Sequence, residues 1–224
     1  SDEASQTLTY VVTSVPSLSL GQIVLVDGTT VVSAGTAYSL SQLQGMKFKP
    51  AADANGGPAT FAWKVQDSGG GNDTLNESLQ ITVTPVNDPP IPGNDTLANI
   101  AEDSGTLTIP FATLLANDAA GPANESGQNL TITGVSSAVG GSVSIVGTNV
   151  LFTPTPDYNG PASFTYTVQD DGTTNGSLDP KSATANVNFT VTAVNDPPVR
   201  TSGTLSNLTV AEDAVATSLV LGSL

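Results

Sequence analysis

The chain has 224 residues, with five Lys or Arg, 20 Asp or Glu and no His, which gives a formal net charge of −15 at pH 7. A chain this acidic is repelled by nucleic acid and by anionic membrane surfaces, so cations are its expected ligands. Because there is no Cys, disulfide bonds are excluded, and stability must come from an apolar core and from bound metal. No apolar run approaches the roughly 20 residues of a membrane span, so no direct membrane insertion is expected.

The sequence repeats itself with a period close to that of an immunoglobulin-sized unit. The pentapeptide Val-Asn-Asp-Pro-Pro at residues 86–90 recurs at 194–198, and 194 − 86 = 108. Residues 60–67 are likewise similar to 163–170, and the Ala-Glu-Asp at 101–103 recurs at 211–213. Such periodicity indicates a tandem array. We therefore expect a module lacking its first strand at 1–88, a complete module at 89–196, and the first strand or strands of a third at 197–224, all cut from a longer protein.

Short runs that alternate β-branched or aromatic residues with polar ones predict strands and almost no helix. In chain order, the complete module should contain strands at 107–109, 130–135, 143–146, 150–153, 162–168 and 185–194, with one helical turn at 111–117. Phe164, Tyr166 and Val168 fall on one face of their strand, as in a half-buried antiparallel sheet. The pattern predicts an all-β protein built of tandem Greek-key β-sandwich modules of the cadherin or immunoglobulin kind, arranged end to end.

The Asn-Asp-Pro-Pro segments are the predicted joints between modules. A Pro pair favours extended geometry and donates no backbone hydrogen bond, so a strand cannot continue through it, and the joint should be semi-rigid. Acidic residues gather in loops next to these joints. Calcium takes six to eight oxygen ligands, many of them carboxylates, so a site built by the fold must collect side chains from distant positions.

Several motifs occur together in one order. These are the joint pentapeptide, the Ala-Glu-Asp opening, the Phe-Thr-Pro-Thr-Pro-Asp-Tyr-Asn-Gly stretch at 152–160 and the Val-Gln-Asp-Asp-Gly stretch at 168–172. As a set they resemble the cadherin-like tandem repeats of large bacterial (RTX-type) surface adhesins, over essentially the whole chain. In cadherins, calcium lies between modules. The resemblance therefore implies Ca²⁺ at the first joint on Asp53, Asn87 and Asp88 from below and Asp118 and Asp170 from above. At the second joint it implies Glu102, Asp157, Asn195 and Asp196, with the upper loops lying beyond residue 224.

Departures from the cadherin pattern lower the expected number of ions. Pro85 and Ala193 stand where a cadherin linker usually carries a further Asp, so one or two ions per joint are expected rather than three. Plainer interpretations also stay open. Asn-Asp before Pro-Pro is an ordinary turn sequence, and Asp157 and Asp170 lie in turn signals as well. Glu102 fits a solvated charge at a strand end equally well.

The resemblance implies calcium-rigidified extender repeats of a large secreted or cell-surface adhesin, active in adhesion and biofilm, which hold a distal binding region away from the cell. The alternative is a binding module for carbohydrate or homotypic cell–cell contact. An enzyme is not expected, since without His or Cys most acid–base and nucleophilic arrangements are missing. The expected partners are neighbouring repeats and, by head-to-tail strand complementation, the tail at 204–221 of another chain.

Overall fold

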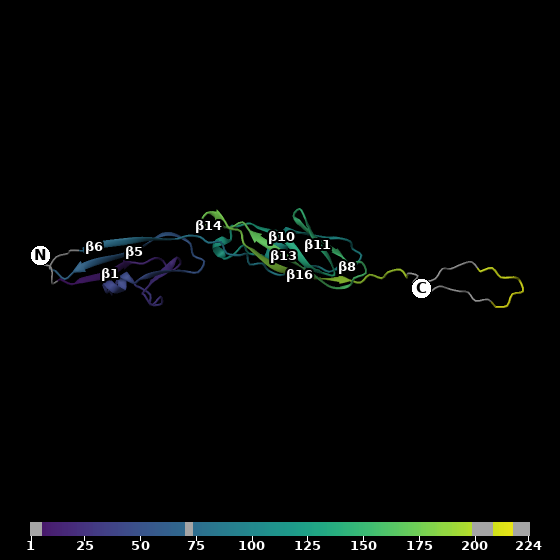
Figure 1. The fold of residues 1–224 in the computed structure, drawn as a ribbon, viewed down its shortest axis with the longest axis horizontal. Coiled ribbons are helices and arrows are strands. Elements are labelled where there is room, and N and C mark those ends of the chain that lie inside the picture. The colour runs from purple at the N-terminus through teal and green to yellow at the C-terminus, as the bar shows by residue number, and fades with distance from the viewer. Residues whose placement is uncertain (1–5, 70–73, 199–207, 217–224) are drawn as a thin grey trace.

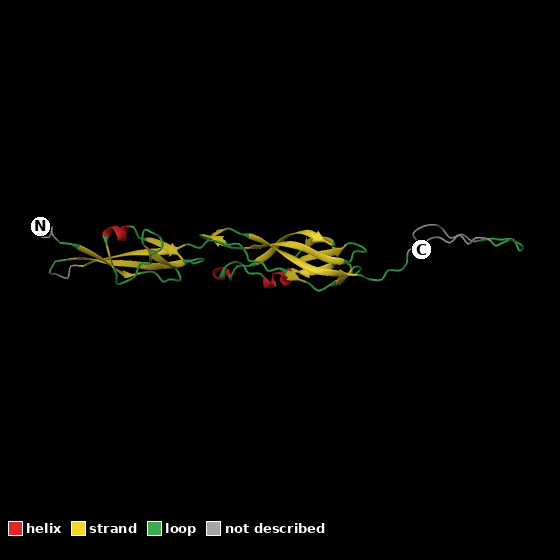
Figure 2. Cartoon of the chain, turned by 90° about the horizontal axis from the view of Figure 1, so that it is seen from below, coloured by secondary structure: helices red, strands yellow, loops and turns green. Residues whose placement is uncertain are grey.

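The computed structural model describes residues 6–69, 74–198 and 208–216. Its strands form two groups that follow one another along the longest axis in Figure 1, and Figure 2 shows that helices are few and short. We call the first group unit one; it contains β1 (Leu8–Ser14), β2 (Gly21–Val24), β3 (Ala37–Tyr38), α1 (Leu40–Gln44), β4 (Lys47–Pro50), β5 (Gly56–Asp67) and β6 (Thr74–Val83).

The second group is unit two. Its elements are β7 (Asp95–Thr96), β8 (Ile100–Ala101), β9 (Leu107–Pro110), α2 (Phe111–Leu114), η1 (Leu115–Asn117), η2 (Ala123–Glu125), β10 (Leu130–Val139), β11 (Gly141–Val146), β12 (Asn149–Pro154), β13 (Gly160–Asp170), β14 (Thr173–Thr174), β15 (Ser177–Leu178) and β16 (Ser182–Thr192). The predicted strands and the helical turn at 111–117 are confirmed, and most strands are longer than predicted. The last strand is an exception at its end: it was predicted to run to residue 194, but β16 ends at Thr192. Strands β7, β8, β14 and β15 and the turn η2 were not foreseen, because two- and three-residue elements leave no periodicity to detect.

Unit two is a sandwich of two sheets. One sheet has the order β10-β13-β16-β7, with β8 also paired to β16, and the other has the order β11-β12-β9. Strands β7 and β8 run parallel to β16, whereas β13 pairs with it in antiparallel register. The two inner faces pack on each other, so the predicted all-β sandwich is confirmed.

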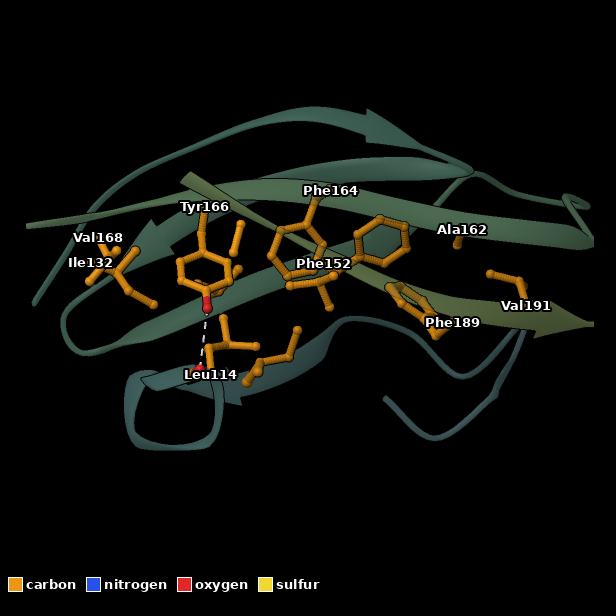
Figure 3. Close-up of a cluster of buried hydrophobic side chains, with 13 residues drawn as sticks. Leu114, Ile132, Phe152, Ala162, Phe164, Tyr166, Val168, Phe189 and Val191 are labelled. Carbon is orange, nitrogen blue, oxygen red and sulfur yellow. Dashed lines mark hydrogen bonds between the residues drawn. The ribbon is translucent and has the colours of Figure 1, made fainter. Parts of the chain in front are cut away.

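The core of unit two shows why the alternating pattern predicted the fold. Phe164, Tyr166 and Val168 of β13 are at most 1% exposed, whereas their neighbours in sequence face outwards. Phe152 of β12 meets Phe189 of β16 edge to face, with ring centroids 4.9 Å apart. Figure 3 shows both rings within the core. An edge-to-face aromatic pair adds stability beyond that from burial alone. The core therefore joins the two sheets through large rings.

Unit one repeats only part of this plan. Its order β1-β5-β6 matches β10-β13-β16, and β2-β4 matches β11-β12. Among the described residues of unit one, no strand takes the place of β7, β8 or β9. Its buried core is correspondingly small, consisting of Val12, Ile23, Val32 and Phe61.

Replacing Phe152 by Ala should lower the free energy of unfolding of unit two by about 3–5 kcal/mol, because a fully buried ring leaves a cavity. Phe48, which occupies the corresponding place in unit one, is only half-buried, so Phe48→Ala should cost less. Urea unfolding followed by circular dichroism checks both changes. The single Trp63 reports unit one alone, and its fluorescence midpoint should not move in Phe152→Ala.

Candidate metal-binding joint between the units

The first joint, residues 84–90, is fixed to unit two through Asn87, which is 2% exposed. Its backbone N–H donates to Thr174 Oγ1 at 2.9 Å. Its side-chain Nδ2 donates to Asp170 Oδ1 at 2.8 Å and to the carbonyl of Asp179 at 2.9 Å, while Oδ1 accepts from Gln128 Nε2 at 2.7 Å. The Asn87 side chain thus has a hydrogen-bond partner at each polar atom, and the linker cannot turn freely.

Gly172 makes room for this contact. A Cβ atom on Gly172 would overlap the side-chain amide of Asn87. The same loop also holds Asp170, because Gly172 N and Lys181 N donate to Asp170 Oδ1 at 3.1 and 2.9 Å. Oδ1 of Asp170 therefore accepts three hydrogen bonds, from Asn87, Gly172 and Lys181. These bonds hold in place a carboxylate that is only 3% exposed.

Other oxygens at this joint are buried without a hydrogen-bond partner. They are Oδ2 of Asp170, Oε2 of Glu125 and Oε1 of Gln128. Glu125 is 6% exposed, and its other oxygen, Oε1, accepts from the backbone N–H of Asp88 at 3.0 Å. A buried carboxylate oxygen without a partner is costly. The hydrogen bonds of Asn87 and Asp88 connect all three orphaned oxygens to the same short linker segment.

A cavity of about 190 Å³ between the units is lined by Asp88. Its polar lining residues are Asp53 and Asn55 of unit one, Thr84 and Asp88 of the joint and Asn124 of unit two. Its volume exceeds the roughly 30 Å³ that one water molecule occupies in the liquid. The structure thus brings the predicted ligands Asp53 and Asp88 to one cavity, and the predicted ligands Asn87 and Asp170 to one hydrogen-bond network.

Asp118, the remaining predicted ligand of the first joint, belongs to a different cluster. Its carboxylate accepts from the Tyr166 hydroxyl at 3.0 and 3.1 Å and from Gly93 N at 2.8 Å. Burial raises the pKa of Asp118 above its usual value. Burial and the nearby charge of Asp118 also raise the pKa of Asp95, whose Oδ2 is buried without a partner. In this structure Asp118 anchors a core tyrosine.

At the second joint, residues 193–198, Glu102 holds the end of β16. Its Oε1 accepts from Val194 N at 2.7 Å, and its backbone N–H donates to the Thr192 carbonyl at 3.0 Å. Glu102 is 6% exposed, so the interpretation as a solvated strand-end charge does not describe its place. Asn195 Nδ2 donates to the Asp196 carbonyl at 3.3 Å.

The carboxylates around Asp196 lie close enough to affect its ionisation. The charges of Asp103, then of Asp157 and Glu102, raise the pKa of Asp196. The charges of three of the four residues predicted for this joint, Glu102, Asp157 and Asp196, therefore interact. Asp157 also has a φ of 58°, and Asp53 a φ of 56°, the left-handed conformation that short polar residues tolerate in turns. Both residues thus have a turn role, as the plainer interpretation of Asp157 expected.

Sequence reasoning missed Glu125, Gln128, Asp103 and Asp179. Glu125 and Gln128 lie in the long connection between α2 and β10, a stretch without a counterpart in unit one, so the repeat comparison had nothing to align with it. Asp103 was visible beside Glu102 in the repeated Ala-Glu-Asp. Throughout the described ranges, no group of three or more His, Cys, Asp or Glu side chains is arranged to hold a metal ion. A cation here would need amide, carbonyl or water oxygens as well.

Residues 86–192 match the family model described as the Cadherin-like domain. A search of curated proteins gave no match. The match begins inside the first joint and ends with β16, so it covers all of unit two, and a domain of this kind suggests a role in adhesion or as an extender.

In the described part of the chain, no helix is long and apolar enough to cross a membrane.

Among solved structures, the chain is similar to the endo-fucoidan hydrolase MfFcnA4 of glycoside hydrolase family 107, with 20% identity and a TM-score of 0.31 over 84% of this chain and 24% of that one. For MfFcnA9 of the same family the identity is 15% and the TM-score 0.30, over 81% and 27%. The chain thus spans about a quarter of the length of these enzymes. The prediction that the chain is not an enzyme is contradicted by these matches to hydrolases, whose TM-scores of about 0.3 assign this chain no activity.

Changing Gly172 to Ala should destabilise unit two by about 1–3 kcal/mol, because the added methyl group displaces a packed, hydrogen-bonded side chain. Gly127→Ala is the matched control, since a Cβ there meets no atom within 4 Å. Urea unfolding measures the difference. Cleavage of the linker by a non-specific protease should also be faster in Gly172→Ala than in the control, and equal rates would contradict the assigned contact with Asn87.

Replacing Asp95 by Asn should stabilise the protein at neutral pH. Because the folded-state pKa of Asp95 is raised, its contribution favours folding below the unfolded pKa and is lost as pH rises through the folded value. The variant removes the charge that is buried above that pH. We expect a melting temperature higher by roughly 2–5 °C at pH 7 and little change at pH 3. An equal gain at both pH values would exclude ionisation as the cause.

Proposed function

We propose that this chain, in which residues 86–192 are a cadherin-like domain, is an extender segment of a secreted or cell-surface adhesin whose joints are made rigid by bound Ca²⁺. Such a segment would hold a binding region away from the cell. The single observation that carries the proposal is the set of orphaned buried oxygens on Asp170, Glu125 and Gln128 at the first joint.

These oxygens fit a hard cation. Asp170 and Glu125 supply negative charge, Gln128 supplies an amide oxygen, and all three donors are oxygens without nitrogen or sulfur. That composition suits Ca²⁺ better than Zn²⁺ or Cu²⁺. Because calcium also accepts amide, carbonyl and water oxygens, it does not require three carboxylates from one place. The residues that would hold it are Asp170, Glu125 and Gln128.

The same argument for a bound cation applies to Asp88 and Asp53. Both line the cavity between the units, Asp53 from unit one and Asp88 from the linker. Without a cation, negative charges that face each other across a joint repel, and the repulsion favours separation of the units. With a cation, the charges are neutralised and the carboxylates hold one another through the shared ion. The linker is already fixed to unit two by Asn87, so a bridge to Asp53 is the step that would fix unit one.

The second joint supports the proposal in the same way. Glu102, Asp157 and Asp196 are close enough for their charges to raise the pKa of Asp196, together with Asp103. Carboxylates held close together repel one another unless a cation neutralises their charge. The chain carries only five Lys or Arg against 20 acidic residues, so a metal ion would supply that charge.

An extracellular location follows from the same chemistry. Calcium modules that work outside the cell have dissociation constants of about 10⁻⁴–10⁻³ M, which match the calcium available there. A rigid spacer that needs calcium would be flexible wherever calcium is scarce. The proposal therefore places this segment on the cell surface or in the medium.

Calorimetric titration should show calcium uptake by the intact chain, and Glu125→Gln should weaken it by at least about tenfold because a charged ligand is lost. The Gln side chain keeps the acceptor for Asp88 N–H, so the fold should survive. Glu77→Gln removes the same charge on exposed strand β6 and should leave calcium uptake unchanged.

Small-angle scattering with calcium and then with chelator tests the mechanical part. The maximum dimension and its spread should change on chelation in the parent chain and in Glu77→Gln, and change less in Glu125→Gln at limiting calcium. The proposal would be refuted if the chain took up no calcium, or if its maximum dimension were the same with calcium and with chelator.

A further inference from the structure

A short hairpin of unit two lies at the first joint. It is formed by β14 and β15, which pair in antiparallel register and are joined by Asn175 and Gly176. These two residues have φ values of 52° and 79°, as a type I′ turn requires, and Asn-Gly is a sequence that favours this turn. We call residues 173–178 the strap. Figure 1 shows β14 at the end of unit two that faces unit one.

The strap holds the linker by its main chain. The backbone N–H of Asn175 donates to the carbonyl of Pro85 at 3.1 Å. The backbone N–H of Asn87 donates to Thr174 Oγ1 at 2.9 Å. One backbone acceptor and one backbone donor of the linker are therefore paired with two successive residues of the strap. The tripeptide 85–87 is attached at both of its ends.

The Thr174 hydroxyl is oriented for this contact. It donates its single proton to Asp179 Oδ2 at 2.6 Å, so its oxygen accepts from Asn87 N without competition from its own proton. Asp179 Oδ1 accepts from Lys181 Nζ at 2.7 Å. The bond from Lys181, followed by that from Thr174, lowers the pKa of Asp179 and keeps it a charged acceptor. Thr174 is thus a positioning residue for the linker.

The rest of the joint is also bonded to unit two. Asp88 N donates to Glu125 Oε1 at 3.0 Å, and Pro90 is buried. Ile91 exchanges two backbone hydrogen bonds with Ala119, at 2.8 and 3.0 Å. The Pro pair at 89–90 therefore lies in a segment that is fixed on both sides, so we do not expect the joint to bend there.

Unit one ends just before the strap contact. Val83, the last residue of β6, pairs with Gly56 of β5. In the described part of the chain, Pro85 is the first residue with a hydrogen bond to unit two. Only Thr84 stands between them. A residue before Pro is biased to extended conformations, and the φ of Pro itself is fixed at about −65°, so this single residue has a restricted range of motion.

We propose that the strap makes residues 85–88 part of unit two, so that the joint bends at one residue, Thr84, within the range that Pro85 permits. The strap works without a bound ion, because each of its bonds joins two protein atoms, and it therefore does not rest on the calcium proposal. A cation shared by Asp53 and Asp88 would act across this hinge, since Asp53 precedes Thr84 and Asp88 follows it.

Amide hydrogen exchange of the isotope-labelled chain in chelator tests the strap. Thr174→Val removes the acceptor of Asn87 N and keeps the shape of the side chain, so exchange at Asn87 should become roughly tenfold faster. Thr173→Val is the matched control, because it makes the same change one residue earlier in the same hairpin. Thr174→Ser keeps a hydroxyl and should restore the slow exchange, which a merely structural role of the Thr methyl group would not predict.

Distances between the units locate the hinge. Since the chain has no Cys, spin labels on Ser78→Cys in β6 and Thr184→Cys in β16 are the only two. In chelator, Pro85→Ala should broaden the distribution of distances between the labels, because it frees φ at residue 85 and lifts the restriction on Thr84. Pro89→Ala changes a proline within the segment fixed to unit two and should leave the distribution unchanged. Pulsed electron paramagnetic resonance measures both.

Two results would overturn the proposal. The first is exchange at Asn87 that is equally fast in Thr174→Val and Thr173→Val. The second is a distance distribution that Pro85→Ala leaves unchanged, or that Pro89→Ala broadens to the same extent. Neither measurement depends on calcium uptake, so the strap and the metal proposal can fail separately.

Discussion

The inner face of a β-sheet must be covered by apolar side chains from another layer, and this constraint explains most of the molecule. Unit two meets it: β9 and β12 cover the face of β13 and β16, while β7 and β8 close the outer edge of β16. Its core contains 13 buried residues, including Tyr166 and Phe152 at 0% exposure. Unit one has the same central strands without those covering elements in its described part, and its core shrinks accordingly. The difference lies in which strands are present, since the central sequences of the two units are alike.

The joint obeys a second constraint, which is electrostatic. Burying Asn87 against Asp170 fixes the linker, because every polar atom of that amide finds a partner. The same burial removes water from Asp170 and Glu125, and each keeps one oxygen without a partner. At this joint the side-chain amide of Asn87 has its hydrogen-bond partners, whereas Asp170 and Glu125 each keep a buried carboxylate oxygen without one. Such oxygens are suited to bind a cation. The stiffness that we propose for the extender depends on this imbalance.

The two proposals concern different parts of the joint and different kinds of interaction. The metal acts on charged oxygens at the ends of the units, where long-range repulsion has to be neutralised. The strap acts through hydrogen bonds between protein atoms, which fix the linker to unit two whether or not an ion is bound. One governs how the two units are held together, and the other decides where the joint bends.

Sequence alone determined the class of the fold, the period of the repeat and the position of the joints. Alternation along residues 162–168 and 185–194 decides which side chains face inwards, because successive residues of a strand point to opposite sides. The Pro pairs end strands wherever they stand, since they lack a backbone donor. Only the tertiary structure decided which oxygens meet. It placed Asp118 under Tyr166 and brought Glu125 and Gln128 to the linker, because contacts between residues far apart in sequence depend on how whole strands pack.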